Sequence, residues 1–468
     1  MLNGCLLVLP GLSRRYDVMR KNRLYHPNLY RFDSAQPSYW EATVPKSSLV
    51  ATPLVDTHSC DVAIIGGGYT GLSAALHLAR DYGIDARVLD AGHLGWGASG
   101  RNGGFCGIGA TGMALRDFIR RHGEKDARDF YQSQCQAVEL VRTLATDEQL
   151  DIDVCGDAEL DVAHTPKAFK RLQADHELLT GTLGIEARII GADEFRERYF
   201  DSSEQFGALL TRPTFGLHPL RYCRDLASVA ARHGAVLHER SEVLEWTTND
   251  QGRHRLRTAG GTLLANKVIF ATNGFMPEKL RPEFYARSLP VVSAIVVTRP
   301  LSSDELEVHR WSCIQPAINS RRVLNYFRML PDNRFLFGGR GHTVGDPDGE
   351  RQNYAELTAT MHRLWPGWTH VDIDYRWHGL ICFNRTLCPA LGQLEDDASV
   401  FFGFGYHGNG VSTATWAGQQ LADWIGKGRA PTLPAVVKGL SGRFPMAPLR
   451  LKYLRLSIAI SSWLDRSG

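Results

Sequence analysis

Three glycines in a fixed pattern are the residues of this sequence best suited to holding a phosphate group. Gly66, Gly68 and Gly71 form G-x-G-x-x-G. In this pattern the first glycine permits a tight turn, the second lets backbone approach a pyrophosphate, and the third allows close packing of helix on strand. Asp90 follows at the distance where a carboxylate accepts hydrogen bonds from ribose hydroxyls. The pattern predicts a dinucleotide without a 2′-phosphate, and NAD and FAD both fit it.

A second glycine-rich segment, AGHLGWGASGRNGG, comes directly after Asp90. Small residues let a chain pass beneath a large flat ring, and Ser99, Arg101 and Asn102 add polar groups. A flexible loop is the alternative, but Trp96, Arg101 and Asn102 are too specific for a spacer. A nicotinamide dinucleotide has no evident need of this segment. It therefore favours FAD, which is longer and buries its ring between domains.

A third segment, FFGFGYHGNGV at residues 401–411, opens an apparent helix. A helix N-terminus attracts an anion, and the expected one is the N1–C2=O edge of a reduced flavin. Gly408 and Gly410 permit close backbone approach, and Asn409 tolerates a left-handed turn. His407 either bonds the flavin edge or poises a substrate amine, or it satisfies a loop carbonyl. Tyr406 either faces the substrate or packs.

Together GGGYTGLSAALHLA, Asp90, GWGASGRNGG and GFGYHGNGV resemble the D-amino-acid-oxidase-type FAD-dependent oxidoreductases, in particular their γ-glutamylputrescine oxidoreductase-like branch. The resemblance covers about residues 25 to 430. It implies a binding site for FAD and no metal site. Thr386 differs from the resemblance, because relatives often carry an Asp at that position. The residues expected to contact FAD are Gly66, Gly68, Tyr69, Thr70, Gly71, Asp90, Ala91, Ser99, Gly100, Arg101, Asn102, Gly103, Gly104, Val243, Thr272, Gly274, Gly405, Gly408, Asn409, Gly410 and Val411.

The reaction implied is oxidation of an amine or amino-acid C–N bond, with hydride transfer to flavin N5. The imine then hydrolyses, and oxygen or another acceptor reoxidises the flavin. A neutral amine is required, so the pocket must desolvate it or offer a base. The expected catalytic and substrate residues are His407, Tyr406, Arg328 and Tyr326. The substrate suggested by the resemblance is a polyamine derivative like γ-glutamylputrescine.

Tyr326 and Arg328 occupy alternate positions of a predicted strand and so share a face. Arg328 could bind a carboxylate with two hydrogen bonds, and Arg340 is a second candidate. Solvated strand arginines are the simpler interpretation of both. Trp377 and His378 either line the mouth of the pocket or are structural.

Two other functions remain open at this point. The same fold can act on a C–O bond of a 2-hydroxy acid or a polyol phosphate, because fold does not decide substrate. The chain could instead be a non-catalytic or folate-linked flavoprotein.

The elements that must position these residues follow from hydrophobic patterning. A strand at 61–65, a helix at 72–79 and a strand at 86–89 form a parallel crossover unit. Further strands are expected at 242–246, 264–270, 290–298 and within 323–341, and a strand and a helix within 396–425. The fold class is α/β (α+β overall), a Rossmann-like FAD-binding domain with an interleaved substrate domain on a mostly antiparallel sheet. The expected divisions are an arm at 1–56, an FAD domain at 57–150, 210–285 and 375–430, a substrate domain at 151–209 and 286–374, and a tail at 431–468.

Composition narrows the class of protein. The 468 residues carry a formal net charge of +3, without the charge block of a nucleic-acid-binding protein. Nine cysteines with no C-x-x-C pair argue against disulfides and zinc, and no cysteine that would hold the flavin covalently is evident. No apolar run reaches the length of a transmembrane helix.

Residues 1–18 lack a basic stretch before their apolar run, so we expect no signal peptide and a cytoplasmic location. Met19 is an alternative start of the protein. Residues 449–464 suggest a terminal helix that covers the fold, or else one at a membrane surface. Oligomeric state is left open.

Overall fold

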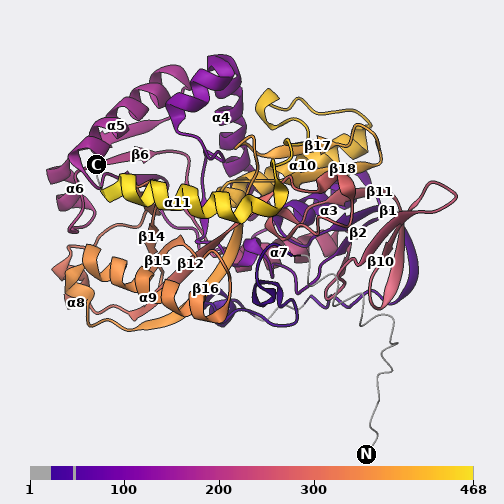
Figure 1. Ribbon diagram of the computed structural model, residues 1–468, viewed down its shortest axis with the longest axis horizontal. Helices are drawn as coiled ribbons and strands as arrows, with labels where there is room; N and C mark the ends of the chain where they lie inside the picture. Colours follow the sequence, from indigo (N-terminus) through magenta and orange to yellow (C-terminus); the bar gives the residue numbers. More distant parts are fainter. Residues whose placement is uncertain (1–22, 46–48, 467–468) are drawn as a thin grey trace, which may run out of the picture.

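Two eight-stranded sheets organise the molecule in the computed structural model, which describes residues 23–45 and 49–466 (Figure 1). The first eighteen residues, with the expectations placed on them, lie outside the described residues. A two-stranded ribbon of β3 (Phe105–Cys106) and β7 (Phe215–Gly216) stands apart from both sheets.

The first sheet has the strand order β17-β18-β11-β1-β2-β8, and its central strands are parallel. α3 (Tyr69–Tyr82), α7 (Pro219–Arg232) and α10 (Gly410–Lys427) cover one face of these strands, and the β9–β10 hairpin with Phe284 covers the other, so the C-terminal part of β1 is apolar and buried on both faces. A hairpin of β9 and β10 extends β11. The strands of this sheet are β1 (Asp56–Ile65), β2 (Ala86–Leu89), β8 (Val236–His238), β9 (Glu245–Thr248), β10 (His254–Arg257), β11 (Gly261–Phe270), β17 (Ala390–Gln393) and β18 (Val400–Phe404).

The second sheet has the order β16-β12-β15-β14-β13-β4-β6-β5 and is antiparallel except where β13 pairs with β4. One face packs on an aromatic core beneath α8 (Ser303–Val308) and α9 (Pro347–Leu364), which includes Trp365, Trp368, Phe335 and Phe337. The strands are β4 (Glu159–Val162), β5 (Ala187–Ile190), β6 (Ala208–Thr211), β12 (Leu289–Pro300), β13 (Ala317–Asn319), β14 (Tyr326–Met329), β15 (Arg334–Arg340) and β16 (Ile373–Phe383).

The helices pack on and between the two sheets (Figure 1). α4 bends at Gly123, where the backbone leaves helical geometry with φ of 82°. The helices are α2 (Tyr39–Thr43), α3 (Tyr69–Tyr82), α4 (Leu115–Asp147), α5 (Pro166–Glu177), α6 (Ala192–Arg198), α7 (Pro219–Arg232), α8 (Ser303–Val308), α9 (Pro347–Leu364), α10 (Gly410–Lys427) and α11 (Arg450–Arg466).

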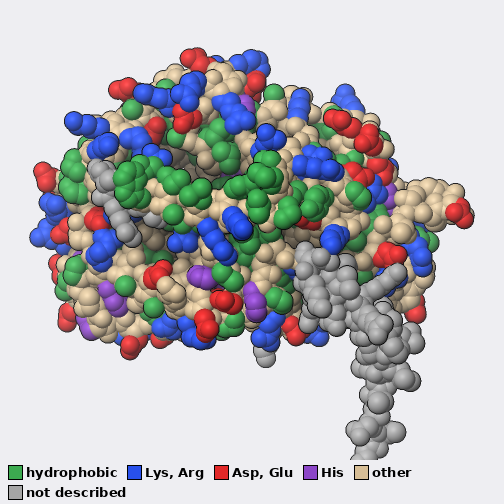
Figure 2. Space-filling view, viewed as in Figure 1, with side chains coloured by type: hydrophobic (Ala, Val, Ile, Leu, Met, Phe, Trp, Pro, Cys, Tyr) green, Lys and Arg blue, Asp and Glu red, His purple; other side chains and the backbone are tan. Residues whose placement is uncertain are grey.

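The C-terminal helix α11 crosses the front of the molecule, drawn in yellow in Figure 1. Arg450 forms an ion pair with Glu278 at its start, and Asp465 accepts two backbone N–H bonds near its end. Its outer side carries a row of apolar side chains that Figure 2 shows as green. These exposed residues are Tyr453, Leu456, Ile460, Trp463 and Leu464. Within the described ranges, none of the helices is long and apolar enough to cross a membrane.

Most of the predicted elements are present, and the mixed α/β fold with a mostly antiparallel second sheet is confirmed. The strand at 86–89 has the predicted bounds, and the helix predicted at 72–79 runs from Tyr69 to Tyr82. The strand expected at 242–246 begins only at Glu245. The eleven-residue strand β16 was not predicted. Its positions Trp377 and His378 were considered for a pocket mouth, but both side chains are buried in the protein interior.

Close backbone contact joins α3 to α10 and depends on glycine. A Cβ built on Gly418 would lie 2.4 Å from the Thr70 carbonyl oxygen and 2.7 Å from the Ser73 Cβ. Ser73 donates a hydrogen bond to the Thr415 carbonyl across the same contact, at 2.7 Å. The first residues of α3 therefore keep their place only while α10 lies directly against them.

We expect Gly418→Ala to destabilise the protein by about 1–3 kcal/mol, because the added methyl group overpacks the contact between α3 and α10. Thermal unfolding should show a lower Tm than wild type. Gly181→Ala is the matched control, since a Cβ at Gly181 has no heavy atom within 4 Å. An unchanged Tm for Gly418→Ala would contradict the rigid contact.

Candidate functional site

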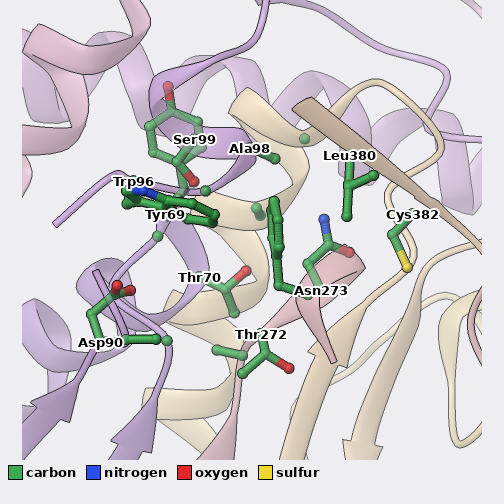
Figure 3. Close-up of a pocket in the computed structure, with 18 of the residues that line it drawn as sticks. Tyr69, Thr70, Asp90, Trp96, Ala98, Ser99, Thr272, Asn273, Leu380 and Cys382 are labelled. Atoms are coloured by element: carbon green, nitrogen blue, oxygen red, sulfur yellow. Dashed lines mark hydrogen bonds between the residues drawn. The ribbon is translucent and has the colours of Figure 1, made fainter. Parts of the chain in front are cut away.

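A long cavity lies where the carboxyl ends of β1, β2 and β11 meet α3 and α10. Parallel α/β sheets bind ligands outside the carboxyl ends of their strands. Asp90 lies at one end of the cavity, Leu380 and Cys382 at the other, and Thr70 and Thr272 between them (Figure 3). The shape suits an elongated molecule.

Asp90 closes the first end of the cavity. Its two carboxylate oxygens accept N–H bonds from Gly67 at 2.6 Å and Gly92 at 2.8 Å. Burial raises the pKa of Asp90, while these two bonds act in the opposite direction. Each oxygen keeps a further lone pair, so the carboxylate can still accept ligand hydroxyl donors.

The turn after β1 forms the middle of the cavity wall. Gly66 has φ of 112°, which only glycine adopts readily, and a Cβ there would lie 2.7 Å from the Ala271 carbonyl oxygen. A Cβ on Gly71 would lie 2.0 Å from the Gly66 carbonyl oxygen. The Ser99 hydroxyl accepts the Tyr69 N–H at 3.0 Å. The N-terminus of α3 thus faces the cavity without large side chains, an arrangement that favours a phosphate.

Buried polar atoms that have no partner among the described residues lie in the middle of the cavity and towards its far end (Figure 3). They are the Thr272 hydroxyl and both ring nitrogens of His407. Unpartnered buried polar groups are costly and mark places where a bound group supplies the missing hydrogen bond. Asn273 lies beside them, and its side-chain oxygen accepts the Gly405 N–H at 2.9 Å.

His407 stands at the turn before α10, in a left-handed conformation with φ of 51°. Burial lowers the pKa of His407 to about 4, and the Cys388 carbonyl lies near enough to oppose this without making a regular hydrogen bond. The ring is therefore neutral at pH 7, with one nitrogen as donor and the other as acceptor. The side chain of Tyr406 points towards α3, where its hydroxyl makes a hydrogen bond with the Thr70 hydroxyl at 2.7 Å.

A second cavity adjoins the first and shares wall residues with it. His407, Gly408, Leu380 and Ile381 line both cavities. The second sheet forms its floor, and the inner side of α11 covers it. The residues that α11 contributes are Leu454, Ser457, Ile458 and Ser461.

Most of the residues predicted as a cofactor site line one of the two cavities. Those on the first cavity are Gly66, Gly68, Tyr69, Thr70, Asp90, Ala91, Ser99, Asn102, Val243, Thr272, Gly408, Gly410 and Val411. Those only on the second are Arg101, Gly103 and Asn409. Five glycines lie behind the wall, each against other protein atoms, and these are Gly71, Gly100, Gly104, Gly274 and Gly405.

Of the predicted catalytic residues, His407 and Tyr326 reach the second cavity, Tyr406 lines the first, and Arg328 lines neither. Arg328 does share a face with Tyr326, but its guanidinium donates to the Leu217 carbonyl at 2.6 Å and to the Cys155 sulfur at 3.2 Å. The suggestion that Arg328 binds a substrate carboxylate does not fit this placement. Arg340, the second candidate, lines the second cavity.

Several residues that line the first cavity were not predicted from the sequence. Leu380, Ile381 and Cys382 come from β16, which was not predicted, and Arg23 comes from the N-terminal arm. Asn273 lies between two residues that were predicted. The Asn-Gly dipeptide after the buried strand β11 was the available signal for it.

Comparisons with known proteins agree with this geometry. The model of the FAD dependent oxidoreductase family, DAO, matches residues 61–424. γ-Glutamylputrescine oxidoreductase of Escherichia coli (strain K12) is 31% identical over 92% of this chain and 98% of that protein. Glycine oxidase of Bacillus licheniformis is 24% identical over 78% of this chain and 92% of that protein. Among solved structures, glycine oxidase from Geobacillus kaustophilus has a TM-score of 0.66 at 22% identity, covering 80% of this chain and 96% of that one.

We expect Asp90→Ala to retain less FAD after purification than wild type, because the ribose end of the cavity loses its acceptor. The flavin absorbance per protein should fall, and the dissociation constant for added FAD should rise about tenfold or more, as for a hydrogen bond to a charged group. Asp85→Ala is the control, because Asp85 does not line the cavity. An Asp90→Ala protein that retains its full content of FAD would contradict the role of Asp90 in binding the ribose.

Proposed function

This chain belongs to the FAD-dependent oxidoreductase family DAO, and we propose that its substrate is an elongated amine similar to γ-glutamylputrescine. The observation that carries the proposal is the second cavity, which meets the first at His407 and extends across the second sheet. It is lined by residues of six strands of the second sheet, from β4 to β16, and its walls carry charged groups of both signs, Glu159 and Arg340 among them.

The first cavity fits FAD. Its polar end at Asp90, its glycine-lined middle and the unpartnered Thr272 and His407 atoms correspond to a ribose, a pyrophosphate and a polar ring edge. The chemistry that bound FAD supplies is acceptance of a hydride from the carbon next to the amine nitrogen, and onward transfer of the electrons to oxygen or another acceptor.

The N-terminus of α10 favours negative charge at the junction of the cavities. Gly410 and Val411, at the start of α10, line the first cavity. Helix N–H groups that face a site where negative charge develops stabilise that charge without reorganisation. His407 adds a neutral donor at the same place. We infer that these groups hold the edge of the flavin ring.

The second cavity prepares the amine. Phe105, Tyr326 and Phe383 line it and remove water from the substrate nitrogen. Desolvation disfavours the charged form of an amine, so its pKa falls and the neutral, oxidisable form gains population. The hydroxyl of Tyr326 bonds the Ser293 hydroxyl at 2.9 Å, and burial raises the pKa of Tyr326 to about 12. Tyr326 therefore stays protonated and orients the substrate rather than acting as a base.

A panel of substrates, mixed anaerobically with the yellow protein, tests the reaction class. We expect γ-glutamyl amines and diamines to bleach the flavin absorbance, and the imine product to hydrolyse to an aldehyde with release of ammonia. Bleaching by 2-hydroxy acids or polyol phosphates alone would overturn C–N oxidation. A flavin that no member of the panel reduces would point to a non-catalytic flavoprotein.

We expect His407→Asn to slow flavin reduction by about tenfold or more at saturating amine, because the shorter amide cannot place its N–H where the imidazole N–H lies. The pH dependence between about pH 6 and pH 9 should keep its shape, since a group with a pKa of about 4 does not titrate there. Rapid-mixing absorbance measurements give both quantities. The exposed His58→Asn is the control, and an unchanged reduction rate in His407→Asn would make His407 structural.

A further inference from the structure

We propose that Glu159, at one end of the second cavity, binds a positively charged amino group of the substrate that is not the group oxidised. This inference rests on the proposed function and narrows its substrate class to amines that carry a second cationic group. Glu159 is not among the site residues predicted from the sequence.

The register of the second sheet places Glu159 on the cavity floor. Asp161 of β4 pairs with Ile318 of β13, and Ile318 pairs with Tyr326 of β14. Directly paired residues point to the same face of a sheet. Glu159 precedes Asp161 by two positions and therefore points to that face as well. Glu159, Ile318 and Tyr326 all line the second cavity.

The carboxyl groups of Glu159 and Asp161 make no side-chain hydrogen bond or ion pair to any residue in the described parts of the chain. The arginines near β4 are already committed. Arg171 donates to the Ser320 carbonyl at 2.5 Å, and Arg212 pairs with Asp157 and Glu186. Both residues are half-buried, and a carboxyl group that is partly removed from water without a partner is costly in a folded protein. The sheet thus holds two acidic groups on one face without a direct ion pair to any described residue, and Arg171 acts on Asp161 only from a distance.

Burial raises the pKa of Glu159, and the charge of Asp161 raises it further. An ammonium group in the cavity would reverse both effects, because it supplies the opposite charge and hydrogen-bond donors. Binding then converts neutral Glu159 into the carboxylate and releases a proton. The groups that act on Asp161 from the neighbouring helix α5 are Asp175 and Arg171, which have opposite signs.

The rest of the cavity makes Glu159 the favoured end for a cation. Arg340 lies on the same floor, three strands from β4, at roughly 14 Å for strands about 4.8 Å apart. Its Nη1 donates to the neutral Gly341 carbonyl at 3.0 Å, so the positive charge of Arg340 is not paired by that bond and repels an ammonium group in the cavity. His407, with 9% of its surface exposed and both ring nitrogens unpartnered, lines the wall next to the first cavity.

Binding to dithionite-reduced holoenzyme tests the proposal, because the reduced protein cannot oxidise the amine. Calorimetry would compare 1,4-diaminobutane with 1-aminobutane on wild type, Glu159→Gln and the control Asp157→Asn, whose carboxylate is exposed and paired with Arg212. We expect wild type and the control to bind the diamine more tightly than the monoamine. Glu159→Gln should lose about tenfold of this preference, as for one charge-assisted hydrogen bond. Repeating the titration in buffers of different ionisation enthalpy should show proton release that Glu159→Gln abolishes.

An unchanged preference in Glu159→Gln at normal FAD content, or no preference in wild type, would overturn the proposal. If Glu159→Gln does not fold, Glu159→Asp carries the test, and it must keep proton release while weakening the preference. The two proposals fail separately. If diamine binding depends on Glu159 but the protein oxidises no amine, the proposed cation site stands and the proposed function fails. If the protein oxidises amines but Glu159→Gln keeps the preference for the diamine, the proposed function stands and the cation site fails.

Discussion

The close approach of backbone to backbone in the turn between β1 and α3 is the constraint on which the first cavity depends. Any side chain at Gly71 would overlap the Gly66 carbonyl, and any side chain at Gly66 would overlap Ala271 at the end of β11. Asp90 fixes the same turn from the other side by accepting the Gly67 N–H. Because three strand ends meet at this turn, β1, β2 and β11 have little freedom to shift relative to one another. The shape of the first cavity is therefore set by the backbone, before any ligand binds.

The two cavities meet because β16 and the turn before α10 serve both sheets. β16 pairs with β12 at the edge of the second sheet, yet Leu380 to Cys382 line the cavity above the first sheet. His407 donates its backbone N–H to the Cys382 carbonyl at 3.2 Å, which joins the turn to that strand. A substrate on the second sheet and a cofactor on the first are thus held by one continuous segment of structure. Small shifts of one sheet against the other are resisted at the place where the reacting groups must meet.

The parts of the site that sequence predicts well are those that need a particular backbone. Gly66, Gly68, Asp90 and the turn at 405–411 stand in local patterns, and such patterns report what the backbone does within a few residues. The substrate side is different, since the roles there come from strand register between distant segments. Glu159 faces the cavity only because β4 pairs with β13, which lies more than a hundred residues away. The shared face of Tyr326 and Arg328 was predicted correctly from alternation, but the carbonyl of Leu217, which takes up the Arg328 guanidinium, has no local signal.

The walls of the first cavity are contributed by residues from Arg23 to Ala414, so the order in which the chain is made matters. β18 joins β11 only after some four hundred residues have been added, and α10, which holds α3 in place, follows β18. During synthesis on a ribosome the N-terminal turn emerges early and lacks the helix that completes it. Long-range contacts of this kind form late and slowly. The emerging chain cannot enclose the cofactor until the residues up to Ala414 have left the ribosome, so FAD can be enclosed only by a nearly complete chain.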